Sequence, residues 1–158
     1  FVKSYLIQNF GAIQIDNIEV DDAVNITRLN IKDSYICCID GDLLGLEGTH
    51  YNWRNFKWVQ TSKEESNYNF WKDVVSGTHN NTKGIPKKGK AFCLKLYSGA
   101  YTSYHYKSRA YKEFVKYFKE EGKKEFIKNY ICCSTLNEYK DFIIPIPIEI
   151  INKEYELV

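Results

Sequence analysis

The stretch SYICCIDGD, residues 34–42, decides the fold class of this chain. Its first six residues are nearly all apolar, which is typical of a central parallel strand buried on both faces. The strand is expected to end at Asp40-Gly41-Asp42, and open α/β sheets bind their ligands at the carboxyl ends of their strands. The stretch therefore predicts an α/β fold with a parallel sheet and two carboxylates at the end of one strand.

The sequence on both sides of this strand alternates between helical and extended patterns. Alternating residues predict an edge strand over 55–60, and Thr61 or Ser62 followed by Glu64-Glu65 resembles a capping box that starts a helix. Tyr68, Trp71, Val74 and Val75 share one face of that helix. Apolar spacing predicts further helices over 1–10, 21–30, 89–97, 109–119 and 123–139, and an extended strap over 142–150 (FIIPIPIEI).

The chain is expected to form a single domain, because 158 residues suffice for one hydrophobic core. Its three expected regions are a partial α/β core with an acidic cluster (1–60), a helix–loop–helix region (61–97), and a helical region with an extended tail (98–158). The chain begins at Phe1 and contains no methionine, which favours a fragment or a processed product.

The charges are segregated along the chain although the net charge is only +2. Acids gather in the first fifty residues, whereas residues 83–95 contain five lysines and no acid. This layout is typical of a metal site beside a phosphate track, and solvated faces that happen to segregate are the alternative. No apolar stretch approaches the ~20 residues of a membrane span, and no signal peptide is recognisable.

The chain contains five cysteines, Cys37, Cys38, Cys93, Cys132 and Cys133. We interpret them as structural thiols of a protein in a reducing, intracellular compartment. The two adjacent pairs are expected to be small buried hydrophobic residues. The three histidines, His50, His79 and His105, lack metal-ligand spacing and are expected on the surface or in loops.

Two acidic motifs are candidate metal ligands. Glu19-Val20-Asp21-Asp22 lies where a loop enters a helix, and Asp40 and Asp42 follow the expected strand. Mg²⁺ prefers oxygen ligands, and paired metal ions that cleave phosphodiesters need several converging carboxylates. The alternative for each motif is structural, namely acids in the first turn of a helix and a turn after a strand.

The loop VVSGTHNNTKGIPKKGKAF, residues 74–92, adds a third motif rich in glycine and lysine. The three motifs, E-x-D-D, a strand ending in D-x-D, and G-I-P-K-K-G, resemble in their order the 5′-nuclease superfamily. That superfamily includes flap endonucleases, the 5′-nuclease domains of bacterial DNA polymerases and bacteriophage 5′→3′ exonucleases. The resemblance covers roughly residues 5–97 and implies a partial PIN-like core with a helix–three-turn–helix DNA-binding element.

The resemblance also implies roles for individual residues. Metal ligands would be Glu19, Asp21, Asp22, Asp40 and Asp42, with Glu19, Asp22, Asp40 and Asp42 as the catalytic set. The DNA-binding residues would be Lys83, Gly84, Ile85, Lys87, Lys88, Gly89 and Lys90. The backbone N–H groups of the hairpin would face a phosphate, with a monovalent cation alongside, while the lysines supply salt-dependent attraction. The implied cofactor is Mg²⁺, or Mn²⁺ in its place.

The chain departs from the family pattern where the family has two more aspartates. These positions hold Gly77 and Asn80, or Thr78 and Asn81 after a shift of one residue. The family's N-terminal strand, its catalytic aspartate and its arch precede the matched region. We therefore expect a nuclease-derived module that binds duplex or branched DNA, with weak or absent catalysis.

Two other functions stay open at this point. One is the C-terminal part of an active Mg²⁺-dependent 5′→3′ exonuclease or flap endonuclease. Its N-terminal part would lie on another chain or would have been removed from this chain. Such an enzyme would act in the cytoplasm of a normal or phage-infected cell. The other is a structural role in which Tyr101, Tyr104, Tyr106 and Tyr111 dock a partner, with core packing as the alternative for most of these rings.

Overall fold

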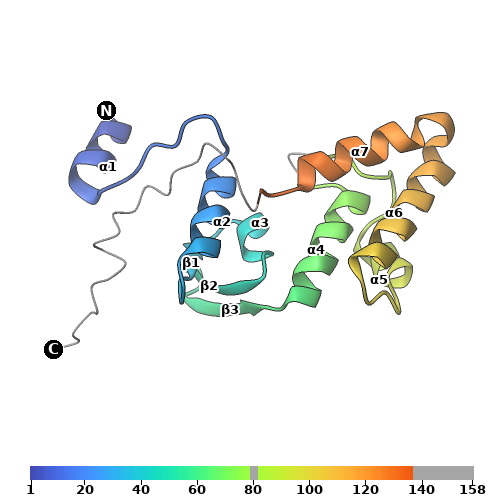
Figure 1. Ribbon diagram of the computed structural model, residues 1–158, viewed down its shortest axis with the longest axis horizontal. Helices are drawn as coiled ribbons and strands as arrows, with labels where there is room; N and C mark the ends of the chain where they lie inside the picture. The colour runs from blue at the N-terminus through green and yellow to red at the C-terminus, as the bar shows by residue number, and fades with distance from the viewer. Residues whose placement is uncertain (79–81, 137–158) are drawn as a thin grey trace. The chain divides into compact units, whose positions relative to one another are not determined.

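The computed structural model describes residues 1–78 and 82–136 (Figure 1). The chain divides into two compact units, here called unit 1 (Phe1–Ser34 with the described residues 135–136) and unit 2 (Tyr35–Ser134). The fold is mixed α/β, with a small three-stranded sheet followed by helices. No helix in the described residues has both the length and the apolar character needed to cross a membrane.

Unit 1 contains the two helices that the N-terminal sequence predicts. They are α1 (Val2–Phe10) and α2 (Val20–Asn30), and α2 carries Asp21 and Asp22 in its first turn. No residue of α1 is buried, whereas α2 buries Asn25 and its apolar neighbours. The acids of the first motif therefore lie at the helix N-terminus, where negative charge is favourable.

Unit 2 begins with the sheet. Strand β1 (Ile36–Cys38) runs parallel to β2 (Gly48–Asn52), which pairs antiparallel with β3 (Lys57–Thr61). The short helix α3 (Gly41–Leu44) connects β1 to β2. The parallel pairing and the edge strand β3 confirm the sequence predictions.

The predicted central position of β1 is wrong. Among the described residues the strand order is β1-β2-β3, so β1 lies at an edge, and Cys37 is exposed. The apolar run indicated a strand buried on both faces, yet one face of the sheet remains open. Strand β2 has the polar sequence GTHYN and was not predicted.

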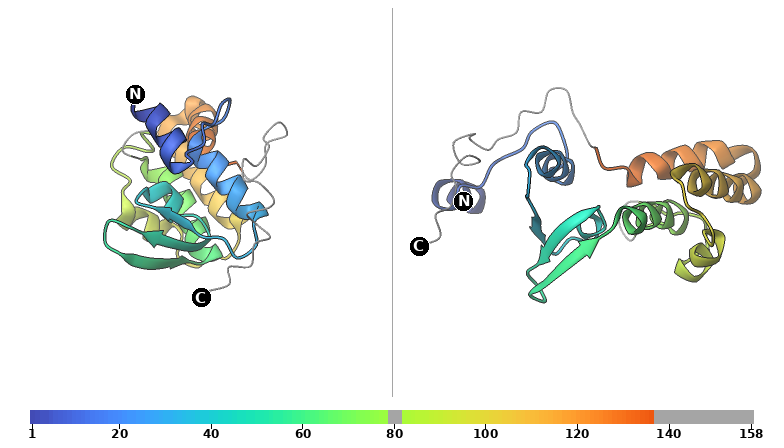
Figure 2. Two further views of the ribbon diagram at one scale, coloured as in Figure 1. Left: turned by 90° about the vertical axis from the view of Figure 1, so that its left-hand side faces the viewer. Right: turned by 60° about the horizontal axis from the view of Figure 1, so that its bottom comes forward.

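The remainder of unit 2 is helical. The capping box at Ser62 and Glu65 is confirmed, since each side chain binds the other residue's backbone N–H. The helices are α4 (Lys63–Ser76), α5 (Lys90–Leu96), α6 (Ser103–Phe118), the 3₁₀ turn η1 (Lys119–Glu121) and α7 (Gly122–Cys133). Figure 2 shows α4, α6 and α7 side by side, as their mutual contacts require.

Two helix boundaries differ from the predicted ones. Helix α6 begins six residues before the predicted start at 109, because the Thr102 side chain accepts a hydrogen bond from the His105 N–H at 3.2 Å and caps the helix. Helix α7 ends at Cys133, so the helix predicted over 123–139 does not extend through residues 134–136. Residues 137–139 and the predicted strap over 142–150 lie outside the described residues.

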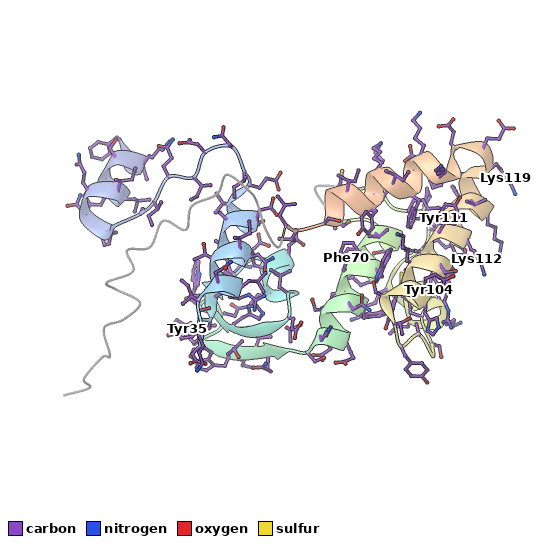
Figure 3. All side chains as sticks on the ribbon, viewed as in Figure 1. Tyr35, Phe70, Tyr104, Tyr111, Lys112 and Lys119 are labelled. Carbon is purple, nitrogen blue, oxygen red and sulfur yellow. The ribbon has the colours of Figure 1, made fainter. Side chains whose placement is uncertain are left out.

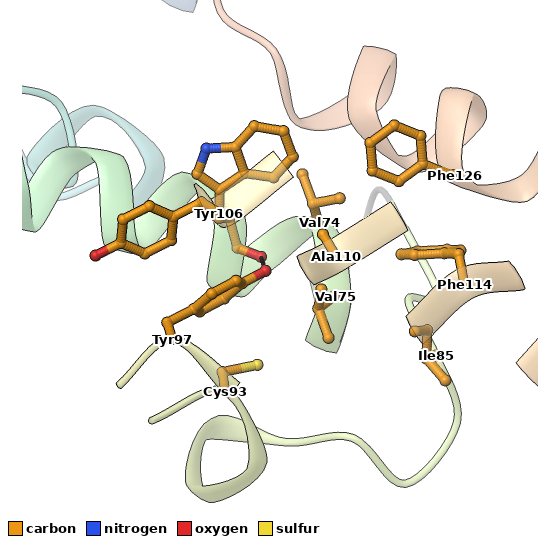
Figure 4. Packing of buried hydrophobic residues seen from close by; sticks show 10 residues of the cluster. Val74, Val75, Ile85, Cys93, Tyr97, Tyr106, Ala110, Phe114 and Phe126 are labelled. Atoms are coloured by element: carbon orange, nitrogen blue, oxygen red, sulfur yellow. Dashed lines mark hydrogen bonds between the residues drawn. The ribbon is translucent and has the colours of Figure 1, made fainter. Parts of the chain in front are cut away.

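The core of unit 2 forms where the helices meet (Figure 4). Trp71 of α4 stacks on Phe126 of α7 with 6.3 Å between ring centroids, and Phe114 of α6 meets Phe126 edge-on at 5.7 Å. The buried Tyr97 hydroxyl donates to the Trp71 carbonyl at 3.0 Å, and burial raises the pKa of this phenol. Of the four tyrosines for which core packing was the alternative, Tyr106 is buried in this core. Tyr101, Tyr104 and Tyr111 are exposed, so core packing does not account for most of these rings.

The expectations for cysteine and histidine are partly wrong. All five thiols are free, but Cys37 and Cys132 are exposed and only Cys93 is fully buried. His50 is fully buried rather than on the surface, because its position on β2 faces the packed side of the sheet. His105 is exposed as expected, and His79 lies outside the described residues.

Candidate nucleic-acid interface and acidic residues

The loop after α4 returns to the end of the helix through close backbone contact. Gly77 has φ 78° and Gly84 has φ 57°, a region that favours glycine. A Cβ on Gly84 would overlap the backbone of Gly77 and Ser76, and a Cβ on Gly77 would lie 2.6 Å from the Thr82 carbonyl oxygen. Both glycines are therefore required for the loop to close on α4.

Hydrogen bonds fix the base of this loop. The Ile85 N–H donates to the Val75 carbonyl at 2.8 Å, and the Thr78 N–H donates to the Thr82 carbonyl at 3.0 Å. The Gly84 N–H donates to Oδ1 of Asn129 on α7 at 3.1 Å, and both residues are buried. The loop is thus anchored to two helices, which restricts the position of the residues that follow.

These bonds correct one role that the family resemblance implies. The N–H groups of Gly84 and Ile85 donate within the protein, so in this structure they are not available to a phosphate. The acceptors are the side-chain amide oxygen of the buried Asn129 and a backbone carbonyl in the last turn of α4. Buried N–H groups need such partners. The exposed Gly89 acts instead as the N-cap of α5.

The lysines after the anchored base fall into two kinds. We call residues 82–90 the lysine hairpin. The Lys88 N–H donates to the Ile85 carbonyl at 3.1 Å, closing a turn with Pro86 second and Lys87 third, and Lys87 has φ 65°, the pattern of a type II turn. Lys83, Lys87 and Lys90 are exposed, so their ammonium groups lie in solvent.

Lys88 differs from the other three lysines. Its Nζ lies 3.9 Å from Oε2 of Glu113 on α6 and 3.9 Å from the centre of the Phe92 ring. It is half-buried and connects the hairpin to α5 and α6. Its charge is partly compensated within the protein, so its contribution to phosphate binding is expected to be smaller than that of the exposed lysines.

The second acidic motif lies on α3 in unit 2. Asp40 is the N-cap of α3, and its Oδ1 accepts a hydrogen bond from the Asp42 N–H at 2.8 Å. Asp40 thus caps a helix after the strand, which is a structural role of the kind expected as the alternative to metal binding. Its carboxylate has further lone pairs that can accept other bonds. Asp42 is exposed in the first turn of α3.

Asp73 on α4 is an acid that the sequence analysis missed. Burial, and to a lesser extent the negative charge of Asp42, raise the pKa of this carboxyl group, while Lys72, with Nζ 2.9 Å from Oδ1, lowers it. The backbone carbonyl of Asp73 accepts a hydrogen bond from the Gly77 N–H at 2.9 Å. Asp73 therefore lies one helical turn before Gly77, the position at which the chain departs from the family pattern. No sequence pattern indicated Asp73, because the influence of Asp42 depends on the tertiary fold.

The first acidic motif belongs to unit 1. Glu19 is the N-cap of α2 without a side-chain cap bond, and Oδ1 of Asp22 accepts a hydrogen bond from the Leu136 N–H at 2.8 Å. The Asn25 amide donates to the carbonyl of the same leucine at 2.9 Å. Asp22 is therefore engaged with the chain after α7. Within residues 1–78 and 82–136, no three His, Cys, Asp or Glu side chains form a group that could hold a metal ion.

The chain departs from the family's two aspartates at positions 77 and 80, or 78 and 81, and the loop just described contains the first position of each pair. Gly77 closes the loop by its left-handed conformation, and Thr78 is the alternative position after a shift of one residue. Asn80 and Asn81 lie outside the described residues. A side chain at 77 would collide with the backbone of Thr82 and Lys83, so this loop conformation excludes an aspartate there.

Asn129 is the second residue that the sequence analysis missed. It lies at the helical spacing of the buried face of α7, three residues after Phe126 and seven after Gly122, and all three are buried. A polar residue at a buried position of an amphipathic helix indicates a specific hydrogen-bond role, and this signal was available in the sequence. Comparisons of the chain with family models, curated proteins and solved structures gave no significant match.

Proposed function

We propose that this chain binds duplex or branched DNA through the phosphate backbone, using the exposed lysines of the lysine hairpin, and that it has weak or absent catalytic activity on its own. The observation that carries the proposal is the anchored hairpin. Lys83, Lys87 and Lys90 are exposed on a turn whose base is fixed by the Gly77–Gly84 contact and by Asn129. Cations held on a fixed backbone lose little conformational freedom when they bind phosphates.

The proposal includes descent from a 5′-nuclease, with α4, the hairpin and α5 in the place of the helix–three-turn–helix element and the sheet in the place of part of a PIN-like core. It is supported by the order of the three motifs and by the two helices that flank the hairpin. Low catalytic activity is supported by Gly77, because its loop conformation excludes a carboxylate at a family metal position.

Fluorescence anisotropy with a labelled duplex tests DNA binding. One variant replaces Lys83, Lys87 and Lys90 by Gln, and a matched control replaces Lys112, Lys116 and Lys123, which are also exposed. If each hairpin lysine neutralises one phosphate, its loss reduces the slope of log K against log salt by ~0.9, or about 2.7 for all three. Equal losses of affinity in the two variants would mean that net charge alone drives binding and would contradict the proposal.

One observation favours a second candidate, the C-terminal part of an active 5′→3′ exonuclease or flap endonuclease. Burial, and after it the negative charge of Asp42, raise the pKa of the half-buried Asp73. Mg²⁺ commonly binds one or two carboxylates together with substrate phosphates, and when bound it would activate water for phosphodiester hydrolysis. Asp42 and Asp73 would hold it together with the substrate phosphates.

Incubation of 5′-labelled duplex and flap DNA with Mg²⁺ or Mn²⁺ separates the two candidates. We expect little or no degradation by the chain alone. Robust hydrolysis that disappears in Asp42→Asn, while duplex binding is retained, would establish the second candidate in place of the first.

A further inference from the structure

The sheet of unit 2 has two chemically different faces. In the strand register, Ile36, His50 and Val59 lie on one face, and the buried His50 has Nε2 2.8 Å from the Leu46 carbonyl. Thr61 on the same face donates from its hydroxyl to the Leu44 carbonyl at 2.9 Å. This face is packed against α3 and the residues that follow it.

The opposite face carries aromatic rings. Tyr51 and Trp58 are direct cross-strand partners with ring centroids 5.1 Å apart, and Tyr35 meets the Trp58 ring edge-on at 4.8 Å. Tyr35 and Trp58 are 56% and 59% exposed. We call these three residues the aromatic sheet face; Figure 3 shows Tyr35 beside the strands of the sheet. Adjacent exposed rings of this kind indicate a binding surface.

The β2–β3 segment that carries the aromatic sheet face is rich in cations. Residues 48–63 contain Arg54, Lys57 and Lys63 and no acid, although the register places Lys57 on the opposite face of the sheet, with Val59. The connection between β2 and β3 adds Arg54 and the exposed rings of Trp53 and Phe56. Within the described part of the chain, none of these three cations forms an ion pair with a carboxylate. The surface therefore combines exposed aromatic rings with a cation, Arg54, that has no ion pair among the described residues.

We propose that the aromatic sheet face binds single-stranded DNA, with unpaired bases stacked on Trp58 and Tyr35 and with Arg54 of the β2–β3 connection at the phosphates. Single-strand sites combine stacking rings with cations along the backbone, and their stacking tolerates any base sequence. The polar groups beside the rings support this mode, because the Thr49 hydroxyl donates to Oε1 of Gln60 at 2.6 Å. These two side chains therefore partly satisfy one another rather than a ligand.

This binding site is distinct from the lysine hairpin, and the proposal does not depend on duplex binding. Base pairs in a duplex keep their flat faces covered by neighbouring pairs, so rings can stack only on unpaired bases. The anionic backbone of a single strand complements Arg54. A protein partner would need acidic side chains opposite this cation. A second copy of this face does not supply them, because residues 48–63 contain no acid.

Anisotropy with a labelled oligothymidylate tests the proposal. Trp58→Ala should weaken binding roughly 5- to 150-fold, the range for loss of one base–aromatic stack. Tyr35→Ala should weaken it in the same direction, while Tyr104→Ala, which removes an exposed tyrosine of α6 (Figure 3), should leave it unchanged. Circular dichroism checks that each variant is folded, as expected for exposed side chains.

Two further arms make the outcome decisive. Arg54→Gln should reduce the salt slope by ~0.7 if Arg54 neutralises one phosphate of the single strand. The variant without Lys83, Lys87 and Lys90 should keep most of its oligothymidylate binding whether or not it loses duplex binding. The proposal is overturned if the protein does not bind the oligothymidylate, or if Trp58→Ala binds it as tightly as the wild type does. It is also overturned if the protein prefers an RNA oligomer. A fourth contradicting result is self-association of the protein that Trp58→Ala abolishes, with no binding of DNA.

Discussion

Replacement of Gly84 by alanine tests the close backbone contact that forms the base of the lysine hairpin. A Cβ at this position would overlap the backbone of Gly77 and Ser76 and lie 2.6 Å from the Val75 carbonyl oxygen. Backbone atoms at the end of a helix cannot rotate away as a side chain can. Gly99 is a matched control, because it has a similar φ of 69° but no atom within 4 Å of an added Cβ.

The two substitutions share one energetic cost and differ in the other. The left-handed conformation costs a residue with a Cβ ~1–2 kcal/mol at both positions. Overlap with packed atoms adds ~1–3 kcal/mol at Gly84 alone. We therefore expect Gly84→Ala to lower the free energy of unfolding by ~1–3 kcal/mol more than Gly99→Ala, a large part of a typical stability of about 5–15 kcal/mol.

Urea unfolding followed by circular dichroism measures this difference, and thermal unfolding provides a second measurement. For a unit of this size, the extra destabilisation corresponds to a Tm lower by about 4–12 °C than in Gly99→Ala. Duplex affinity should also fall in Gly84→Ala, because the lysines lose their fixed base. If the two variants are equally stable, the Gly77–Gly84 contact does not exist as described and the anchored hairpin is refuted.

Three further predictions concern buried polar groups. Asn129→Ala removes the acceptor of the buried Gly84 N–H and should lower the free energy of unfolding by ~1–3 kcal/mol in a urea titration; unchanged stability would contradict the bond. Burial raises the pKa of Asp73, so the folded state holds this proton more strongly and the free energy of unfolding falls as pH rises from 3.8 through the raised pKa. Asp73→Asn should flatten that pH dependence, and an unchanged pH profile of Tm would argue against it. Burial raises the pKa of Cys133 to about 11, so iodoacetamide should modify it more slowly at neutral pH than the exposed Cys132; peptide mass spectrometry showing equal rates would contradict the burial.

Local features of the fold could be predicted from the sequence because they depend on residues close together in the chain. The capping box joins Ser62 and Glu65, which are three positions apart, and the buried face of α4 with Trp71 and Val74 follows from helical spacing. The position of β1 at the edge of the sheet could not be predicted, because it depends on which strands pair. The polar strand β2 exists through its pairing with both neighbours, which composition does not reveal.

The candidate site shows the same limit. The exposed Lys83, Lys87 and Lys90 were identified from the sequence, but the partial neutralisation of Lys88 depends on Glu113 of α6, a contact made by folding. The donor role of the Gly84 N–H depends on Asn129, 45 residues further along the chain. Sequence patterns located the cationic loop, whereas tertiary hydrogen bonds decide which of its groups remain available to a ligand.

Titration of ¹⁵N-labelled protein with a short duplex, followed by amide chemical shifts, tests the central claim most directly. The account predicts that the largest shift changes fall on Lys83, Lys87, Gly89 and Lys90, decrease as salt is added, and leave the aromatic sheet face unperturbed. Absence of shift changes at the lysine hairpin, or changes confined to other elements while the duplex binds, would contradict it.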